Sequence, residues 1–157
     1  MGAYLDDDKG DCSGSAYIFK RDGTSWSEQQ KLLASDGAAN DYFGLSVSIS
    51  GDYAIVGAYG DDSYKGSAYI FKQDGTNWIQ QQKLLASDGA ADDLFGYSVS
   101  ISGDYAIVGA YGDDDKETAS GSVYAFWFCP RADLDDDCKV DFTDFAIFAD
   151  EWLHGTD

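Results

Sequence analysis

The chain has 157 residues, of which 44% are apolar, and it contains 18 glycines but a single proline. That length suits one ordinary domain, or one small domain with an appendage. Its formal net charge of −19 repels phosphate backbones and anionic lipid, which argues against nucleic acid and membrane surfaces as partners. The sequence contains no apolar run of the roughly 18 residues that span a bilayer, so we expect no membrane insertion.

An internal repeat dominates the sequence. Residues 14–62 align without gaps to residues 66–114, and only seven aligned positions differ. A third, partial copy begins at Gly121, and Met1–Tyr4 matches the end of the repeated unit. Because the chain begins inside a unit, we expect Met1 to be an internal start and the absence of a signal peptide to reflect truncation.

Each unit contains four short strand patterns separated by turn signals. The patterns combine apolar alternation with β-branched and aromatic residues, and Asp74-Gly75 is a strong hairpin turn signal. In the best-defined unit the predicted strands are Ser46–Ile49, Tyr53–Ala58, Ser67–Lys72 and Trp78–Leu85. Four antiparallel strands in a unit of this length are typical of a propeller blade. The sequence therefore predicts an all-β fold of about two and a half four-stranded blades over residues 1–127, as an incomplete ring of about ten strands with no helix over residues 14–127.

Two short motifs recur in both units. They are Phe43-Gly44 with Gly57-Ala58-Tyr59, and Phe95-Gly96 with Gly109-Ala110-Tyr111. These residues resemble the FG-GAP repeats of integrin α-subunit propellers, with Tyr in place of the usual Pro, and their flanks look like the bacterial subgroup. The resemblance implies a seven-bladed propeller that recognises a protein or carbohydrate ligand on a cell surface or matrix. Some integrin blades carry a calcium loop between adjacent strands, but the matching turn here, Ser50–Asp52, lacks it.

The inter-strand loops carry clustered acids. They are Asp6–Asp8, Asp61–Asp62 and Asp113–Asp115, and all three clusters follow the same strand of the unit. Packed carboxylates could gather Ca²⁺ weakly, or they could form a solvated, like-charged loop. The sequence leaves both interpretations open.

The composition changes after residue 128. Residues 133–144 place acids at positions 1, 3, 5, 9 and 12 of an EF-hand pattern, and position 7 would offer a backbone carbonyl. Hard Ca²⁺ takes six to eight oxygen ligands, and a twelve-residue loop with this spacing directs them at one centre. An amphipathic helix is predicted directly after it, near residues 142–153. The candidate metal ligands are Asp133, Asp135, Asp137, Lys139, Asp141 and Asp144.

This second predicted domain, residues 128–157, resembles one half of a dockerin. The resemblance implies Ca²⁺ as the bound ion and a possible cohesin-like partner. Two departures limit it: Cys138 stands where the loop usually has Gly, and only one calcium repeat is present. Cys129 and Cys138 could form a disulfide in an oxidising compartment, whereas Cys12 has no evident partner.

Catalysis is not favoured by the sequence. The only histidine is His154 in the tail, and near-identical repeats do not single out a catalytic residue. We expect a non-catalytic extracellular or cell-surface binding or adhesion module. The alternative is a structural spacer or carrier region of a larger secreted enzyme, attached to a partner through the dockerin-like tail. Open sheet edges also predict marginal stability or self-association.

Overall fold

A computed structural model describes residues 1–114 and 120–128. The chain divides into two compact units, Met1–Ala125 and Phe126–Asp157. The calcium loop and helix predicted for the C-terminal segment lie outside the described residues, and the domain boundary predicted after residue 127 stays a prediction. Among the described residues, no helix is both long enough and apolar enough to cross a membrane.

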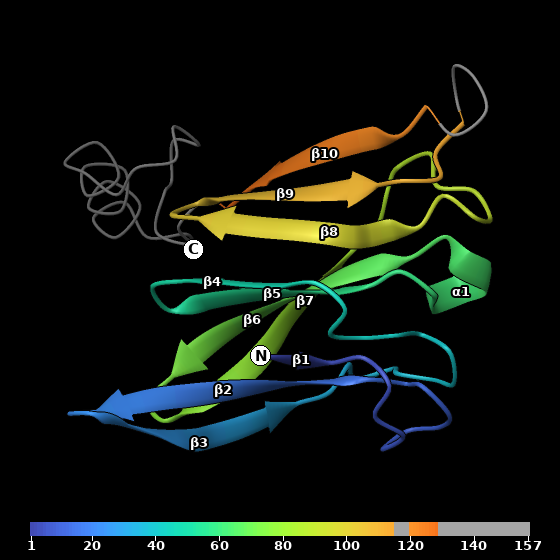
Figure 1. The fold of residues 1–157 in the computed structure, drawn as a ribbon. Helices are drawn as coiled ribbons and strands as arrows, with labels where there is room; N and C mark the ends of the chain where they lie inside the picture. The colour runs from blue at the N-terminus through green and yellow to red at the C-terminus, as the bar shows by residue number, and fades with distance from the viewer. Residues whose placement is uncertain (115–119, 129–157) are drawn as a thin grey trace, which may run out of the picture. The chain divides into compact units, whose positions relative to one another are not determined.

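The described residues form three antiparallel sheets, which we call blades 1, 2 and 3 (Figure 1). Blade 1 has the order β1-β2-β3, with β1 at Gly2–Ala3, β2 at Ser15–Asp22 and β3 at Ser25–Leu32. Blade 2 has the order β4-β5-β6-β7, with β4 at Val47–Ser50, β5 at Tyr53–Ala58, β6 at Ser67–Asp74 and β7 at Asn77–Leu84. Blade 3 has the order β10-β9-β8, with β8 at Phe95–Ser102, β9 at Tyr105–Ala110 and β10 at Ser122–Trp127.

The all-β prediction is confirmed, and the ten strands are consistent with two and a half blades. Blade 2 is complete. Among the described residues, blade 1 has no counterpart of β4 and only the end of a counterpart of β5, while blade 3 has no counterpart of β7. The described residues form no closed ring.

The pairing of the strands is irregular at equivalent positions of the two repeated units. In blade 2 the β6–β7 register shifts between Ile70 and Phe71, and in blade 1 the β2–β3 register shifts between Ile18 and Phe19. These bulges lie at aligned positions of the unit. A β-bulge increases the local twist of a strand pair. The two blades therefore twist at the same point along their strands.

One helical turn interrupts the strands, contrary to the prediction that residues 14–127 contain no helix. It is α1, at Asp61–Tyr64 in the loop between β5 and β6. Asp62, Ser63 and Tyr64 have φ of 47°, 59° and 63°, so three consecutive residues of the turn are left-handed. The left-handed region is tolerated best by Gly, Asn and Asp. The turn therefore lies within the predicted acidic loop, and its backbone is not that of a regular right-handed helix.

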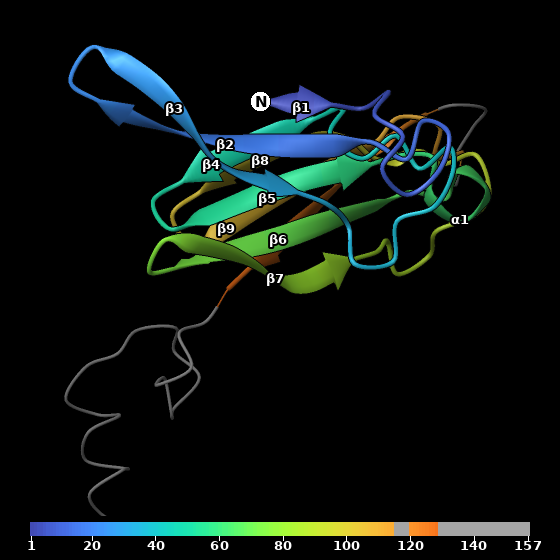
Figure 2. The same ribbon diagram turned by 90° about the horizontal axis from the view of Figure 1, so that it is seen from below.

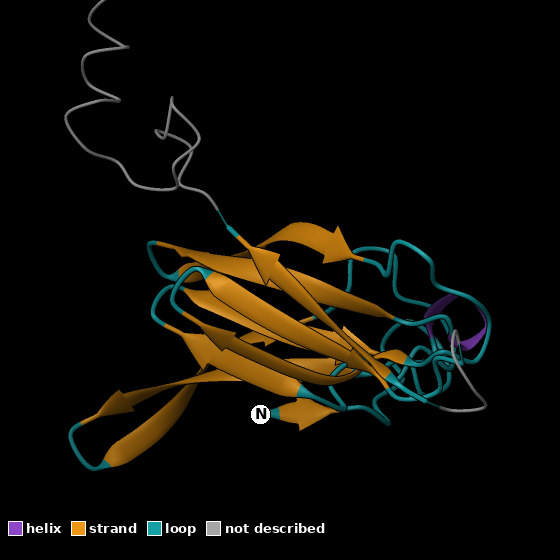
Figure 3. Ribbon diagram, turned by 90° about the horizontal axis from the view of Figure 1, so that it is seen from above, coloured by secondary structure: helices purple, strands orange, loops and turns teal. Residues whose placement is uncertain are grey.

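One cluster of buried apolar residues lies between blades 1 and 2. The rings of Phe43 and Tyr69 meet edge to face, with centroids 5.5 Å apart. Its remaining buried members are Ala16, Leu32, Ala34, Ala54, Val56, Ala58, Phe71 and Trp78. The end of the β2–β3 hairpin projects beyond the other strands of the unit (Figures 2 and 3). Much of that hairpin is exposed as a result, including Trp26, while its counterpart Trp78 is buried.

Candidate functional site

The blades meet through main-chain contacts at repeated glycines. Phe95 forms a parallel bridge with Gly66, and Phe43 forms the equivalent bridge with Gly14. A Cβ atom added at Gly57 would lie 2.0 Å from the carbonyl oxygen of Gly96. No side chain can occupy that space, so the glycines of the two recurring motifs allow one blade to approach the next at van der Waals distance.

Serine hydroxyls extend the contact between blades 2 and 3. Ser46 Oγ donates to the Gly96 carbonyl at 2.7 Å. The Ile101 amide donates to Ser48 Oγ, and the Gly103 amide donates to Ser50 Oγ, each at 3.2 Å. The three alternate serines lie in β4 or directly before it, and they bond to backbone groups in β8 or directly after it. They do so together because side chains two residues apart share one face of a strand.

At the loop end of blade 1, Asp6 is held by cationic and hydroxyl partners. Its carboxylate lies 2.8 Å from Lys31 Nζ and accepts hydrogen bonds from Ser15 Oγ at 2.7 Å and Tyr17 OH at 3.0 Å. Lys31 also pairs with Asp8. The hydrogen bond from Lys31 and those from the two hydroxyls hold the pKa of Asp6 well below its usual range.

The equivalent site in blade 2 is centred on Lys83. Its Nζ lies 2.7 Å from Asp36 and 2.5 Å from Asp61, and Tyr69 OH donates to Asp36 at 2.9 Å. Burial raises the pKa of Asp36, but the hydrogen bonds from Lys83 and Tyr69 outweigh it and leave the pKa below its ordinary value. Asp36 lies in the segment that joins blade 1 to blade 2, so this cluster ties the two blades together.

Blade 3 repeats the aromatic part of this cluster. Tyr124 OH lies 2.7 Å from Asp88 and 2.9 Å from Asp113, and these correspond to Tyr69, Asp36 and Asp61. Burial raises the pKa of Tyr124, and the two carboxylates raise it further. The loop acids of three successive blades therefore hold neighbouring side chains in place. This arrangement favours a structural role over a catalytic one for Asp6, Asp61 and Asp113.

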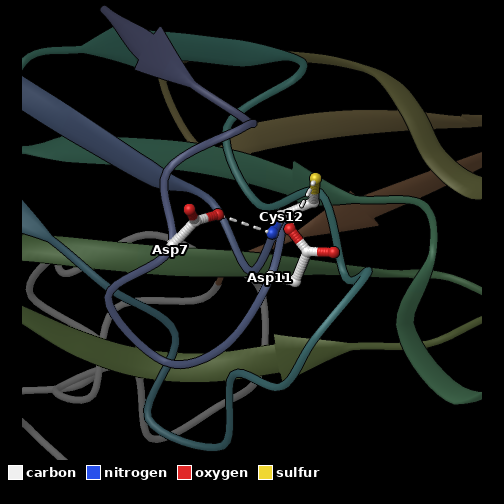
Figure 4. A group of neighbouring side chains, drawn as sticks. All are labelled: Asp7, Asp11 and Cys12. Atoms are coloured by element: carbon white, nitrogen blue, oxygen red, sulfur yellow. Dashed lines mark hydrogen bonds between the residues drawn. The ribbon is translucent and has the colours of Figure 1, made fainter.

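A second acidic group lies in the long loop of blade 1. Ligand atoms of Asp7, Asp11 and Cys12 lie within 4.8 Å of one another (Figure 4). The Cys12 amide donates to Asp7 Oδ1 at 2.9 Å, and its thiol donates to Asp11 Oδ1 at 3.7 Å. Burial and the adjoining carboxylates raise the pKa of the thiol. The raised pKa disfavours the thiolate, which is the nucleophilic form of cysteine.

An apolar groove of about 240 Å³ opens between β2 of blade 1 and β4–β5 of blade 2. Its lining includes Met1, Ile18, Phe19, Val47, Ile49 and Ile55. The groove is lined mainly by apolar side chains, and β2 forms one of its walls. No cluster of titratable groups is among its lining residues.

The six predicted metal ligands lie outside the described residues, as do Cys129 and Cys138. The acidic clusters that contain Asp6, Asp61 and Asp113 were singled out from the sequence, but their partners Lys31, Lys83, Asp36 and Asp88 were not. Their only signal is the matched spacing of Lys31 with Lys83 and of Asp36 with Asp88. Because nearly every position of the two units is identical, that signal does not distinguish them from their neighbours.

The FG-GAP repeat model matches the chain twice, at residues 26–71 and 78–126, which together make up more than half of it. The chain belongs to the FG-GAP repeat family. Each FG-GAP match begins in the last strand of one blade and ends in the third strand of the next, so each spans a contact between blades. FG-GAP repeats suggest a β-propeller-type binding module and occur in extracellular or cell-surface proteins. A comparison with curated proteins gave no match.

Proposed function

We propose that this FG-GAP chain is a non-catalytic binding or adhesion module that acts outside the cell or on its surface. The observation that carries the proposal is the recurrence of the same loop-end contacts in successive blades. Lysine, tyrosine and serine side chains there engage the loop carboxylates in each of the three blades. The repeats instead present a row of similar loops, which suits recognition of an extended protein or carbohydrate ligand.

Recognition is tested by retention of the full chain on insoluble cellulose, on chitin and on immobilised collagen. Retention that saturates on one of these surfaces supports a binding module and gives the class of ligand. Unretarded passage over all three, in the presence and absence of millimolar Ca²⁺, argues against this proposal. Serum albumin on the same support is the control for nonspecific adsorption.

The proposal includes Ca²⁺ binding by the dockerin-like segment. Asp133, Asp135, Asp137 and Asp144 would supply carboxylate oxygens, Asp141 would act directly or through water, and Lys139 would supply its carbonyl. So many carboxylates repel one another without a cation, so ion binding would order the loop and the following helix. With Cys138 at the usual Gly position, we expect an affinity in the extracellular range of roughly 10⁻⁴–10⁻³ M.

Calorimetric titration of the full chain with Ca²⁺ tests this part of the proposal, alongside far-ultraviolet circular dichroism. We expect one binding event with a gain of helix. The variants Asp133→Asn and Asp144→Asn should lose both signals. The matched control is Asp7→Asn, which removes the same charge from the blade 1 loop and should leave both signals unchanged. Absence of heat at several millimolar Ca²⁺, or loss of the signal only in Asp7→Asn, would contradict the assignment.

A further inference from the structure

Four tyrosines gather where blade 2 meets blade 3. Tyr59 directly follows β5, and its ring contacts the rings of the other three. It stacks on Tyr42, with centroids 5.0 Å apart and planes 9° apart. It meets the ring of Tyr97 edge to face at 5.7 Å and lies 6.3 Å from the ring of Tyr64. We call this group of rings the tyrosine cluster.

The tyrosine cluster draws on four separate segments of the chain. Tyr42 lies in the segment that leads from β3 to β4, Tyr64 ends α1, and Tyr97 lies in β8. The end of β5, α1 and the beginning of β8 lie at the same end of the blades (Figure 1). Tyr64 is 38% exposed and Tyr97 is 47% exposed, while the other two tyrosines are half-buried. Two described blades therefore share an accessible aromatic surface, which is typical of a binding surface.

The tyrosine cluster lies where the two repeated units differ. Tyr42 and Tyr97 are two of the seven differing positions, and their counterparts are Leu94 and Leu45. Leucine fills such a position without offering a ring face or a hydroxyl. Because most other positions of the units are identical, tyrosine on both sides of Tyr59 makes this contact chemically different from its repeat.

The loops do not need these rings in order to fold. The backbone is left-handed at Tyr42, with φ of 54°, and at its counterpart Leu94, with φ of 60°. The same holds for Tyr64, with φ of 63°, and for its counterpart Cys12, with φ of 53°. This conformation is unfavourable for bulky residues. Since the loops adopt it with leucine or cysteine as well, the tyrosines are not explained by the backbone alone.

The rings of the tyrosine cluster can attract a cation. Burial raises the pKa of Tyr59, and burial together with the hydrogen bond to Tyr64 raises the pKa of Tyr42. Both phenols are therefore uncharged at neutral pH. The face of an aromatic ring is the negative side of its quadrupole. It attracts a cation placed within about 6 Å of the ring centroid.

Carboxylates lie around the tyrosine cluster, but they already have partners. Asp61 and Asp62 share α1 with Tyr64, and each pairs with a lysine. Asp7 accepts a hydrogen bond within the blade 1 loop, and that loop contacts the backbone of Tyr42. With a net charge of −19, the chain attracts cations. The site therefore suits a cation that uses ring faces and negative potential and that needs no carboxylate as a hydrogen-bond acceptor.

We propose that the tyrosine cluster binds a trimethylammonium group, an inference that rests on the proposed binding function and names the chemistry of its ligand. Such a group carries one positive charge and no N–H donor. Its methyl groups pack on the accessible rings of Tyr64 and Tyr97. An ammonium group with free N–H bonds is strongly hydrated and loses more on leaving water. A choline unit and a trimethylated lysine carry the same group, so both are candidate sources.

Calorimetric titration of the full chain at fixed ionic strength tests the proposal and separates the two sources. The probes are choline and the amide of N-acetyl-trimethyllysine. At least one should bind, about tenfold more tightly than dimethylbutanol, the uncharged carbon analogue of choline. The amides of N-acetyl-lysine and N-acetyl-arginine carry the same charge and should bind about fivefold more weakly than trimethyllysine or choline. Equal binding of the uncharged analogue, or tighter binding of either unmethylated cation, overturns the proposal.

Variants identify the site on the chain. Tyr42→Leu and Tyr97→Leu introduce the residues that the other unit carries, so both should fold, and each should weaken binding about fivefold. Tyr97→Phe keeps the ring and should bind like the parent. Tyr105→Leu, which changes a tyrosine 62% exposed on β9, is the matched control and should have no effect. Circular dichroism establishes that each variant is folded. Binding that neither leucine variant in the tyrosine cluster weakens would overturn the assignment.

The outcome is separate from that of the proposed binding function. If neither trimethylammonium probe binds at several millimolar, this inference is wrong, even where cellulose, chitin or collagen retains the chain. If a probe binds and the variants behave as expected, the inference is supported, even where all three surfaces fail to retain the chain.

Discussion

Ile49 and Ile101 occupy the same position of two nearly identical sequences, and their environments differ completely. Both follow a Ser-Val-Ser segment and precede a Ser-Gly-Asp turn. Ile101 lies against blade 2, whereas Ile49 faces a groove from which the corresponding strands are absent. The two strands are formed by the same local sequence, but burial depends on the neighbouring blade. In a repeat of this kind, the local sequence determines where a strand forms. The neighbouring blades determine how deeply the side chains of that strand are buried.

The largest expected difference comes from truncating each isoleucine. Ile101→Ala removes a buried side chain and leaves a cavity, so we expect it to lower the free energy of unfolding by about 3 kcal/mol. Ile49→Ala, measured at a concentration where the chain is monomeric, should change it by less than about 0.5 kcal/mol. Denaturant unfolding monitored by circular dichroism measures both. Similar costs for the two variants would mean that the blades do not differ as described.

The two lysine clusters give a smaller contrast. Lys83→Met leaves Asp36 and the mostly buried Asp61 without their cation, so we expect a loss of about 2 kcal/mol of unfolding free energy. Lys31→Met removes the same group from blade 1, where neither partner is as buried as Asp61: Asp6 is 34% exposed and Asp8 is 37% exposed, compared with 14% for Asp61, so the variant should cost less. The comparison uses the same denaturant titration in low and high salt. A larger loss in Lys31→Met would reverse the assignment of Lys83 as the link between blades.

The smallest expected effect is the dependence of stability on pH. The folded-state pKa values of Asp6 and Asp36 are lowered, so these groups stabilise the fold above the ordinary Asp value of about 3.9, and that contribution is lost as the pH falls through and below it. Burial raises the pKa of Asp41, so its protonation acts in the opposite direction. We expect the melting temperature to fall as the pH is lowered from about 5 to about 2. Asp36→Asn should flatten this decline and Asp41→Asn should steepen it, and the opposite order would contradict the assignment.

The strands were predictable because their signals are local. The predicted strand Tyr53–Ala58 has the observed bounds, and the predicted Ser46–Ile49 differs from β4 by one residue at each end. The pattern around Ser98 did not show that β8 begins at Phe95, because an irregularity between Phe95 and Ser98 interrupts the alternation on which the prediction depended. The 52-residue offset then placed the strands of the other blades.

The contacts at the loop ends were less accessible from sequence. Lys83 and its partner Asp36 are separated by 47 residues, and no local pattern joins them. The near identity of the units removes the variation that would otherwise single out such residues. The burial of Ile101 and the exposure of Ile49 could not be predicted either, because both depend on which strands lie beside them. The proposed calcium ligands stay a prediction from spacing alone.

The close approach of Gly57 to Gly96 has a consequence for how such chains can vary. Where the blades meet at these glycines, main chain touches main chain, with no side chain between. A larger or smaller residue elsewhere on either face can change how tightly two blades hold each other, but it cannot alter the distance at this point. The equivalent contact of Gly2 with Gly44 sets the same distance one blade earlier. Successive repeats therefore keep the same spacing between neighbouring blades. The residues on the exposed surfaces of the blades can differ from one repeat to the next.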